Sequence, residues 1–455
     1  MIKKIALPDL RFRSPFAKFS LLTLGAMLVL LIGGILIRPI GAANACSGWP
    51  LCGVGFSLPG NFWEWIQVAH RLTVGLVGVL MLILLLRAWR SQRTQTAILV
   101  ATTATAALYL LQMMLGALKV TRQFPFYLVA LHAATAVAVW GALLLQVYFV
   151  GRAARSGQDE QLEAEQAVQR VNLGRDFLAL TKPIVVALLL VTTYAGMVIG
   201  AKAWPSGVMT FWVLLGGFLA AGGSGAINQY IDRYDDTKMQ RTQQRPLPAG
   251  RLTSGEGLAF GVVMTLTSFY LMAAFVNLLA ALLSLAGIIY YVFLYSIWLK
   301  KATVQNIVIG GGAGAIPPLV GWAAATGSLN IPALFLFVVV FMWTPPHFWA
   351  LAIVRSKDYA RAGVPMLPVV RGEKETRTKI FIYTIVLVVL TLLLPFFGLG
   401  GSIYLVLAGL LGIWLLHSAW KVWKQGGNKL AWKMYRYSSM YLAFLFIALM
   451  VDALN

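Results

Sequence analysis

The sequence predicts an all-α, polytopic membrane protein with about thirteen transmembrane helices. Of its 455 residues, 59% are hydrophobic and 11% are charged, which is more apolar surface than a water-soluble domain of this length can bury. Apolar runs long enough to cross about 30 Å of hydrocarbon as a helix recur along the chain. The predicted spans are 19–37, 65–86, 96–118, 126–150, 183–201, 208–230, 256–276, 279–298, 304–324, 331–353, 380–398, 402–420 and 437–454.

Positive charge follows the predicted topology. The net charge of +22 would indicate nucleic-acid binding in a soluble protein. Here 32 of the 37 lysines and arginines fall in segments that alternating spans place on the side of the N-terminus, and the five exceptions are Arg38, Arg71, Lys119, Arg122 and Lys202. By the positive-inside rule that side is cytoplasmic. We therefore expect a multi-pass protein of the inner (plasma) membrane with a cytoplasmic N-terminus, an external C-terminus, the lipid bilayer as its surroundings and no nucleic-acid partner.

The N-terminal segment allows a second interpretation. Four basic residues before position 14, an apolar run and then Ala43-Asn44-Ala45 have the order of a cleaved signal peptide. The apolar run is longer than the usual core of such a peptide, and Arg38-Pro39 separates it from the small residues. A retained first helix also keeps the charge pattern alternating, so we expect a transmembrane helix here.

The two cysteines, Cys46 and Cys52, share the first predicted external loop. An oxidising compartment permits a disulfide that closes this short loop, and a pair of free thiols is the alternative.

A polar segment divides the chain into two modules. Residues 158–165 hold four of the fifteen acidic residues, a composition typical of a linker. We predict a four-helix module over 1–150, a cytoplasmic linker over 151–174 and a nine-helix module over 175–455. In the larger module two long, charged cytoplasmic loops lie four helices apart. Such a weak pseudo-repeat is typical of folds in which the substrate site lies where two halves meet.

The first of these loops begins with oxygen-bearing side chains at the end of a helix. Asn228, Asp232 and Asp236 are spaced i, i+4, i+8, so on a helix they share one face. Two stacked carboxylates repel each other unless a cation lies between them. Mg²⁺ takes one or two carboxylates and completes its octahedron with phosphate oxygens and water, and Asn228 adds a neutral oxygen. We predict that these three residues are catalytic Mg²⁺ ligands of a metal-diphosphate site.

Basic residues follow the three oxygen ligands directly. Guanidinium groups match phosphate geometry, so we predict Lys238, Arg241 and Arg245 as catalytic residues and Arg251 as a substrate-binding residue. The alternative is an ordinary basic cytoplasmic loop whose acids relieve its own repulsion. That alternative explains each arginine singly, but not three oxygen side chains at four-residue spacing.

The segment from Asp232 to Gly250 resembles the first motif of the UbiA-type prenyltransferases. Its run M-Q-R-T-Q-Q-R-P-L-P-A-G over 239–250 is similar to the haem O synthase branch of that family, the protoheme IX farnesyltransferases. The second loop supports the same branch with T-P-P-H-F-W over 344–349 and K-D-Y over 357–359. The likeness spans roughly 175–454, which is the whole second module.

The resemblance implies transfer of a farnesyl group from farnesyl diphosphate to a vinyl group of haem B, giving haem O, with Mg²⁺ as cofactor. It also implies a catalytic role for Asp358 and substrate binding by Lys357 and Tyr359. Many relatives in the wider superfamily carry a second Asp-x-x-x-Asp here, whereas this chain has Ala362 where the second acid would stand. The first motif is therefore expected to carry most of the Mg²⁺ coordination.

His347 falls near the cytoplasmic end of the module's sixth helix, behind two prolines that can break it. A histidine within a span is a functional candidate, and we predict that His347 binds substrate by positioning the haem iron or a propionate, or by accepting a proton. The alternative is a helix-end histidine bonded to a carbonyl that the prolines free. An allylic carbocation also needs apolar, aromatic walls, for which the helices offer Tyr230, Trp322, Trp343, Phe348 and Trp349.

Two histidines of the first module, His70 and His132, lie at matching depth in the second and fourth spans. Such a pair can supply both axial ligands to one haem, or can be two buried structural histidines. The cysteine loop, residues 64–71 and residues 130–133 resemble one half of haem A synthase, a family that oxidises haem O and usually has two halves. The resemblance implies that His70 and His132 bind haem.

This module departs from that family in two ways. A single half is present, and Gln67 stands where the active half usually has a glutamate. Glu64 could substitute, the module could bind haem without oxidising it, or dimerisation could restore two halves. Haem A synthase or terminal oxidase assembly proteins are then candidate partners, beside haem B and farnesyl diphosphate.

Two further functions compete with this interpretation. One is a UbiA-type enzyme that prenylates a quinone precursor or chlorophyllide. The other is a membrane transporter, since pseudo-repeats and broken helices are common in transporters. Against a transporter, the polar sites cluster in cytoplasmic loops.

Overall fold

The chain folds into long helices, as a computed structural model shows for residues 12, 14–37, 42–53, 58–155 and 172–455. The described residues contain no strand, and thirteen of their helices are long and apolar enough to cross a membrane. The fold class and the thirteen predicted spans are thus confirmed, with ends that move by several residues. The acidic segment 158–165 and the Arg38-Pro39 pair lie outside the described residues, so the linker and the domain bounds stay predictions.

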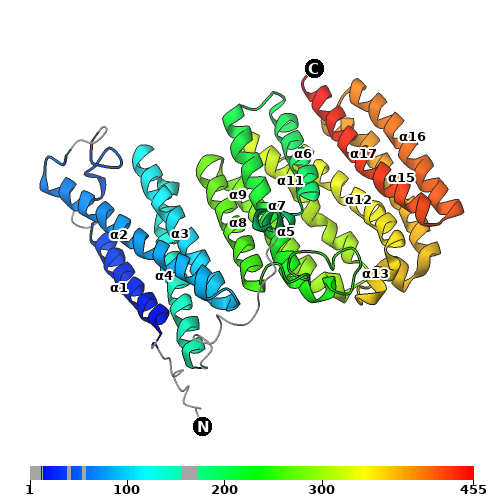
Figure 1. The fold of residues 1–455 in the computed structure, drawn as a ribbon. Helices are drawn as coiled ribbons and strands as arrows, with labels where there is room; N and C mark the ends of the chain where they lie inside the picture. The colour runs from blue at the N-terminus through cyan, green and yellow to red at the C-terminus, as the bar shows by residue number, and fades with distance from the viewer. Residues whose placement is uncertain (1–11, 13, 38–41, 54–57, 156–171) are drawn as a thin grey trace, which may run out of the picture. The chain divides into compact units, whose positions relative to one another are not determined.

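The chain forms two compact units. One comprises Met1–Gln169 with Thr253–Leu266, and the other comprises Arg170–Leu252 with Thr267–Asn455. In the first unit, α1, α2, α3 and α4 pack in a ring, each against two others (Figure 1). Their bounds are α1 Pro15–Leu36, α2 Phe62–Ser91, α3 Thr96–Thr121 and α4 Phe126–Arg155, with a short 3-10 helix at Ala42–Asn44.

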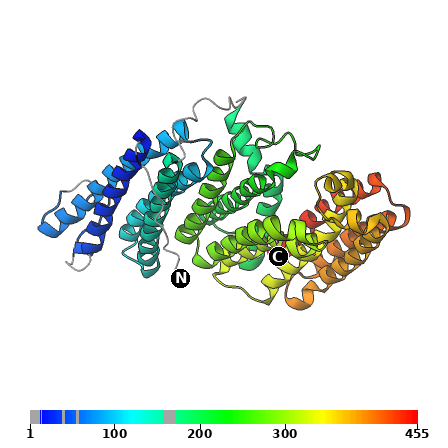
Figure 2. The ribbon, with the colours of Figure 1, turned by 90° about the horizontal axis from the view of Figure 1, so that it is seen from below.

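The second unit is built around α6, α11 and α12, whose buried side chains form its main core with those of the last three long helices. Those last three, α15, α16 and α17, pack in chain order (Figure 1 and Figure 2). From α5 onward the helices are α5 Leu173–Leu180, α6 Pro183–Ala201, α7 Gly207–Asp236, α8 Ser254–Phe275, α9 Leu278–Ile289, η2 Tyr290–Leu299, α10 Lys300–Ala302, α11 Asn306–Thr326, α12 Ile331–Val354, α13 Ser356–Arg361, α14 Leu367–Val370, α15 Gly372–Leu393, η3 Leu394–Phe397, α16 Ser402–Gln425 and α17 Asn428–Ala453. Of these, α8 is divided between the two units.

Glycines allow α6 and α11 to approach closely. A Cβ at Gly321 would lie 1.8 Å from the carbonyl oxygen of Thr193, and a Cβ at Gly196 would lie 2.3 Å from that of Pro318. Small residues at helix crossings are the usual means of tight packing in a bilayer, where apolar side chains gain little by leaving lipid. This close pair anchors the core beside which α7 carries the predicted diphosphate motif.

The prolines of α12 do not break it. The helix continues through Pro345 and Pro346 to Val354, so the two prolines before His347 leave the span unbroken. Prolines are tolerated within membrane helices when neighbouring helices and nearby hydroxyls satisfy the freed backbone groups.

Candidate functional site

The last two turns of α7 carry the three predicted metal ligands. The helix extends to Asp236, six residues beyond the predicted end of the span, so Asn228, Asp232 and Asp236 all lie on one helical stretch. Their side chains are buried, with 3%, 4% and 2% of their surfaces exposed. Burying two carboxylates is costly unless they are paired with cations.

Each of these residues contacts a cation from a different segment. Lys300 on α10 places its Nζ 2.6 Å from Asp232 Oδ2. Arg245, in the loop after α7, places Nη1 2.7 Å from Asp236 Oδ2. Lys182, the residue before α6, donates from Nζ to the amide oxygen of Asn228 at 2.5 Å. Cations from three separate segments therefore surround one helix face. We call Asn228, Asp232, Asp236, Lys182, Lys300 and Arg245 the α7 cradle.

The surroundings of Lys182 in the α7 cradle shift its pKa. Burial lowers its pKa from the usual lysine value to about 7, and Arg245 lowers it too, while Asp232 and Asp236 oppose the shift. An anion bound beside Lys182 would favour its ammonium form.

The two charged loops of the second unit pack together. Met239, from the loop after α7, shares a buried cluster with Tyr359, Val364 and Met366 from the loop after α12. Burial raises the pKa of the Tyr359 hydroxyl, and the charge of Arg241 opposes that shift. Arg241 and Tyr359, predicted from different loops, therefore lie within electrostatic reach of each other.

Other predicted residues lie outside the α7 cradle. Arg251 pairs with Asp176 on α5 at 2.9 Å, and Lys238 lies 3.9 Å from Asp235 of α7. Asp358 pairs with Arg361 of its own short helix, and Lys357 is exposed. The structure thus joins these residues to local partners, and their catalytic or binding roles stay predictions.

His347 is enclosed by helix packing. Its ring stacks between those of Trp343 and Tyr435, with centroids 4.2 and 4.4 Å away, and Nδ1 lies 2.8 Å from the hydroxyl of Ser438 on α17. The bonding partner is therefore a hydroxyl of another helix rather than a carbonyl freed by the prolines. A role for His347 in haem binding stays a prediction.

The predicted aromatic walls are used largely for packing between helices. Trp343 donates from Nε1 to the carbonyl of Ser438 at 2.7 Å, and Trp349 meets the ring of Tyr383 edge-on. Two tyrosines of η2 lie beside the α7 cradle instead. The Tyr291 hydroxyl accepts a hydrogen bond from Lys182 Nζ at 3.1 Å, and the Tyr295 ring stacks on that of Tyr291 with their centroids 5.8 Å apart.

Sequence reasoning missed four residues at this site: Lys182, Tyr291, Ser296 and Lys300. The two lysines had been counted only as positive charge on the cytoplasmic side. A signal was present in the Lys300-Lys301 pair that directly follows an aromatic run with three tyrosines. Pairing Lys300 with Asp232 required knowing which helix packs against α7.

The donor set of the α7 cradle fits Mg²⁺. Within the described ranges no three His, Cys, Asp or Glu side chains gather into a metal-binding cluster, so the protein offers two carboxylates and one amide oxygen. Mg²⁺ suits such a partial oxygen set, because it usually keeps water and takes phosphate oxygens as its remaining ligands. The adjacent cations then match the phosphates rather than the metal.

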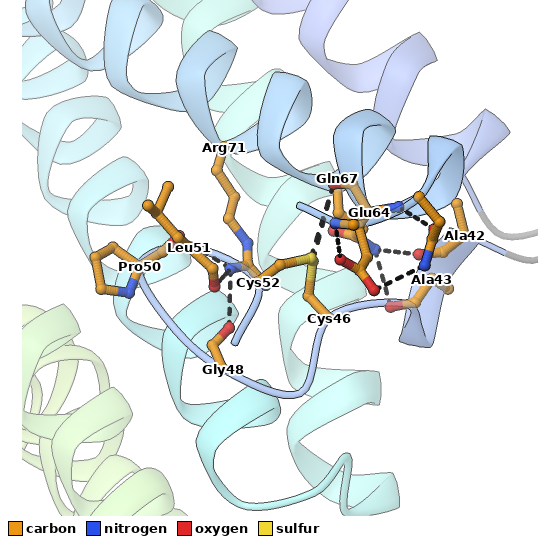
Figure 3. Close-up of a disulfide and its surroundings, with 12 residues drawn as sticks. Ala42, Ala43, Cys46, Gly48, Pro50, Leu51, Cys52, Glu64, Gln67 and Arg71 are labelled. Carbon is orange, nitrogen blue, oxygen red and sulfur yellow. Dashed lines mark hydrogen bonds between the residues drawn. A yellow bond between two sulfur atoms is a disulfide. The ribbon is translucent and has the colours of Figure 1, made fainter. Parts of the chain in front are cut away.

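The cysteine loop of the first unit is held at several points. A disulfide joins Cys46 to Cys52 (Figure 3). Arg71 donates from Nη1 to the carbonyls of Gly48, Pro50 and Leu51 at 2.9, 2.9 and 2.5 Å. The cysteine loop is thus fastened to the helical turn that carries His70.

The two residues compared with the family's catalytic glutamate, Gln67 and Glu64, both have structural partners. Gln67 is buried and donates to the carbonyls of Ala42 and Ala43 at 2.6 and 2.9 Å (Figure 3). The Glu64 carboxylate accepts from Gly60 N and Asn61 Nδ2, both at 2.8 Å, so it serves the N-terminus of its own helix. The suggestion that Glu64 replaces a catalytic glutamate gains no support from this arrangement.

Both histidines of the first unit lie opposite glycines. A Cβ at Gly34 of α1 would lie 3.4 Å from Cε1 of His70, and a Cβ at Gly116 of α3 would lie 3.2 Å from Cε1 of His132. His132 Nε2 is also 3.3 Å from Gln112 Nε2. The glycines leave room for the imidazoles, and the haem-ligand assignment stays a prediction.

Comparison with known proteins places this architecture in a family. The model of the UbiA prenyltransferase family matches residues 189–447. A protein from Roseiflexus castenholzii named protoheme IX farnesyltransferase is 41% identical over 97% of this chain and 85% of its own length. One of the same name from Gloeobacter violaceus is 48% identical over 64% of this chain and 96% of its own length.

A solved structure has a fold similar to that of a large part of this chain. It is described as concerning digeranylgeranylglyceryl phosphate synthase in membranes, and it superposes with a TM-score of 0.53 at 18% identity, covering 62% of this chain and 98% of that chain. The segment matched by the family model contains the α7 motif and both charged loops. The chain therefore belongs to the UbiA prenyltransferase family.

Proposed function

We propose that this protein transfers the farnesyl group of farnesyl diphosphate to a vinyl group of haem B, producing haem O in a Mg²⁺-dependent reaction. The observation that carries the proposal is the α7 cradle, in which buried acids that suit a divalent cation stand beside three cations that suit phosphate. Relatives named protoheme IX farnesyltransferase support haem B as the prenyl acceptor.

In the proposed reaction the C–O bond of farnesyl diphosphate breaks and the diphosphate keeps the electron pair. A C–C bond forms at the terminal vinyl carbon of haem B, water adds to the neighbouring carbon, and a proton leaves to solvent. Mg²⁺, held by Asn228, Asp232 and Asp236, would supply a Lewis acid for the leaving group. Lys300, Arg245 and Lys182 would stabilise the charge that develops on it, because preorganised cations act strongly in a water-poor site.

The proposal also assigns a place and an orientation. Thirteen candidate spans make the chain a multi-pass membrane protein. We place it in the inner membrane with the N-terminus in the cytoplasm and the C-terminus outside, as the positive-inside rule favours. The α7 cradle and both charged loops then lie at the cytoplasmic face, where a water-soluble diphosphate product can leave.

Product analysis tests the proposal. Purified protein in lipid, given haem B, farnesyl diphosphate and Mg²⁺, is expected to yield a haem whose mass and spectrum match haem O. The same mixture with EDTA should yield none. Turnover of an aromatic quinone precursor or of chlorophyllide without any farnesylated haem would instead identify a different UbiA-type prenyltransferase. Transport of either substrate without product would favour the transporter.

For the first unit, we propose that His70 and His132 bind one haem. Gln67 and Glu64 both have structural partners, which favours haem binding without oxidation and leaves haem A formation to a partner such as haem A synthase or a terminal oxidase assembly protein. A reduced-minus-oxidised spectrum of the purified protein is expected to show a bis-histidine haem b. His70→Ala and His132→Ala should each abolish it, with His417→Ala as the control. An unchanged spectrum in both variants contradicts the proposal.

A further inference from the structure

The span that carries Lys300 contains an extended π-helical stretch. Residues Tyr290–Leu299 form a ten-residue π-helix between α9 and α10. Most π-helices are single-turn insertions, and they are frequent at functional sites. No proline or glycine lies within 288–303 to explain the change in winding. The contacts of this stretch with α7 supply an explanation.

Three polar groups, two of the π-helix and one directly after it, contact residues of the α7 cradle. Tyr291 meets Lys182, Ser296 lies 3.0 Å from the Asn228 amide nitrogen, and Lys300 pairs with Asp232. In an α-helix, nine residues span two and a half turns at about 3.6 residues per turn, so Tyr291 and Lys300 would face opposite ways. A helix with i→i+5 bonding winds more slowly, and nine residues complete about two turns.

The hydroxyl proton of Ser296 has a defined direction. Its Oγ donates to the carbonyl of Tyr291, five residues earlier, at 2.8 Å. A hydroxyl has one proton, so toward Asn228 this oxygen can only accept. The Asn228 Nδ2 group therefore points to Ser296, and its second proton goes to Asp232 Oδ2 at 3.0 Å. Both amide protons of Asn228 are then in use.

This network decides which way the Asn228 amide faces. The two ends of an amide have nearly the same shape, so its orientation follows from its hydrogen bonds. A flipped amide would turn Oδ1 toward the lone pairs of Ser296 and of the Asp232 carboxylate. In the observed orientation Oδ1 meets Lys182, which itself lies within electrostatic reach of Asp232, Asp236 and Arg245.

We propose that Ser296 is a positioning residue that locks the Asn228 amide with its oxygen directed into the α7 cradle, where it is available to a metal-diphosphate. Ser296 and Asn228 are both buried, so water does not compete for their hydrogen bond. The proposal rests on the proposed function, because it concerns a ligand of the same site. Ser296 acts through Asn228 and touches neither substrate nor metal.

Metal binding without turnover tests this role. The full-length protein is titrated with Mn²⁺ in the presence of inorganic pyrophosphate, and free Mn²⁺ is followed by electron paramagnetic resonance. Ser296→Ala should weaken Mn²⁺ binding about tenfold, the equivalent of roughly one buried hydrogen bond. Ser296→Thr keeps the hydroxyl and should stay within about twofold of the parent. Ser284→Ala, at a buried serine of α9, is the matched control and should leave affinity unchanged.

A second variant separates orientation from packing. Asn228→Asp presents equivalent oxygens on both sides, so in that background Ser296→Ala should change Mn²⁺ affinity less than about twofold. Should Ser296→Ala not be recovered folded, Ser296→Cys takes its place, because a thiol is a weak acceptor. Parent-like Mn²⁺ affinity in the alanine or cysteine variant, or a full effect that persists with Asn228→Asp, overturns the role of Ser296. A parent protein that binds no Mn²⁺-pyrophosphate overturns the proposed function as well.

Discussion

Replacing Asp232 and Asp236 together with asparagine is expected to lower Mg²⁺-dependent diphosphate release by at least about 10³-fold, since loss of a single preorganised electrostatic group at a reacting centre already costs about 10²–10³. Asparagine keeps the size of each side chain and removes its charge. Without the carboxylates the site loses both charged oxygen ligands for the metal. Release of pyrophosphate from farnesyl diphosphate, measured against Mg²⁺ concentration, checks the result.

Folding must be separated from chemistry in this experiment. The double substitution leaves Lys300 and Arg245 without their carboxylate partners, and breaking a buried ion pair typically costs about 3–5 kcal/mol. Asp235→Asn is the matched control on the same helix. Asp235 is buried, but its partner Lys301 is half-exposed, so solvent screens this pair more than the pairs of Asp232 and Asp236, and activity should stay within about threefold. Full activity in a folded double variant would rule out the metal site.

Lys300→Gln is expected to lower kcat/KM for farnesyl diphosphate by about 10²–10³-fold. The Lys300 ammonium is 10% exposed and lies 2.6 Å from Asp232, so its charge acts where water screens it poorly. Glutamine is one bond shorter and can still donate hydrogen bonds, but it cannot neutralise a departing diphosphate. Initial rates at varied farnesyl diphosphate, with saturating haem B and Mg²⁺, give the ratio.

The adjacent residue supplies the comparison. Lys301 is 56% exposed and pairs with Asp235 outside the α7 cradle, so Lys301→Gln should change kcat/KM by less than about threefold. Both substitutions remove one positive charge from the same short helix. Equal losses in the two variants would mean that the effect comes from net charge at the membrane surface, and the assignment of Lys300 to the leaving group would be wrong.

Local features of the sequence determined the membrane architecture and the core of the motif. Hydrophobicity and length predicted all thirteen spans, because a segment must bury about thirty ångströms of backbone in lipid wherever it lies in the fold. The common face of Asn228, Asp232 and Asp236 followed from four-residue spacing, since helical geometry is set by neighbouring residues alone. The structure extends α7 far enough to include all three.

The identity of the cations around these acids was decided by tertiary structure. Lys238 follows the motif closely in sequence, yet it faces Asp235, whereas Lys182 and Lys300 lie far away in sequence and contact Asn228 and Asp232. The direction of Lys300 also depends on the π-helical winding of the preceding ten residues. The charge and hydropathy patterns of the sequence predict how many lysines lie on one side of the membrane. Which of them enters the α7 cradle depends on the packing and rotation of another helix, and these are properties of contacts between segments distant in the chain.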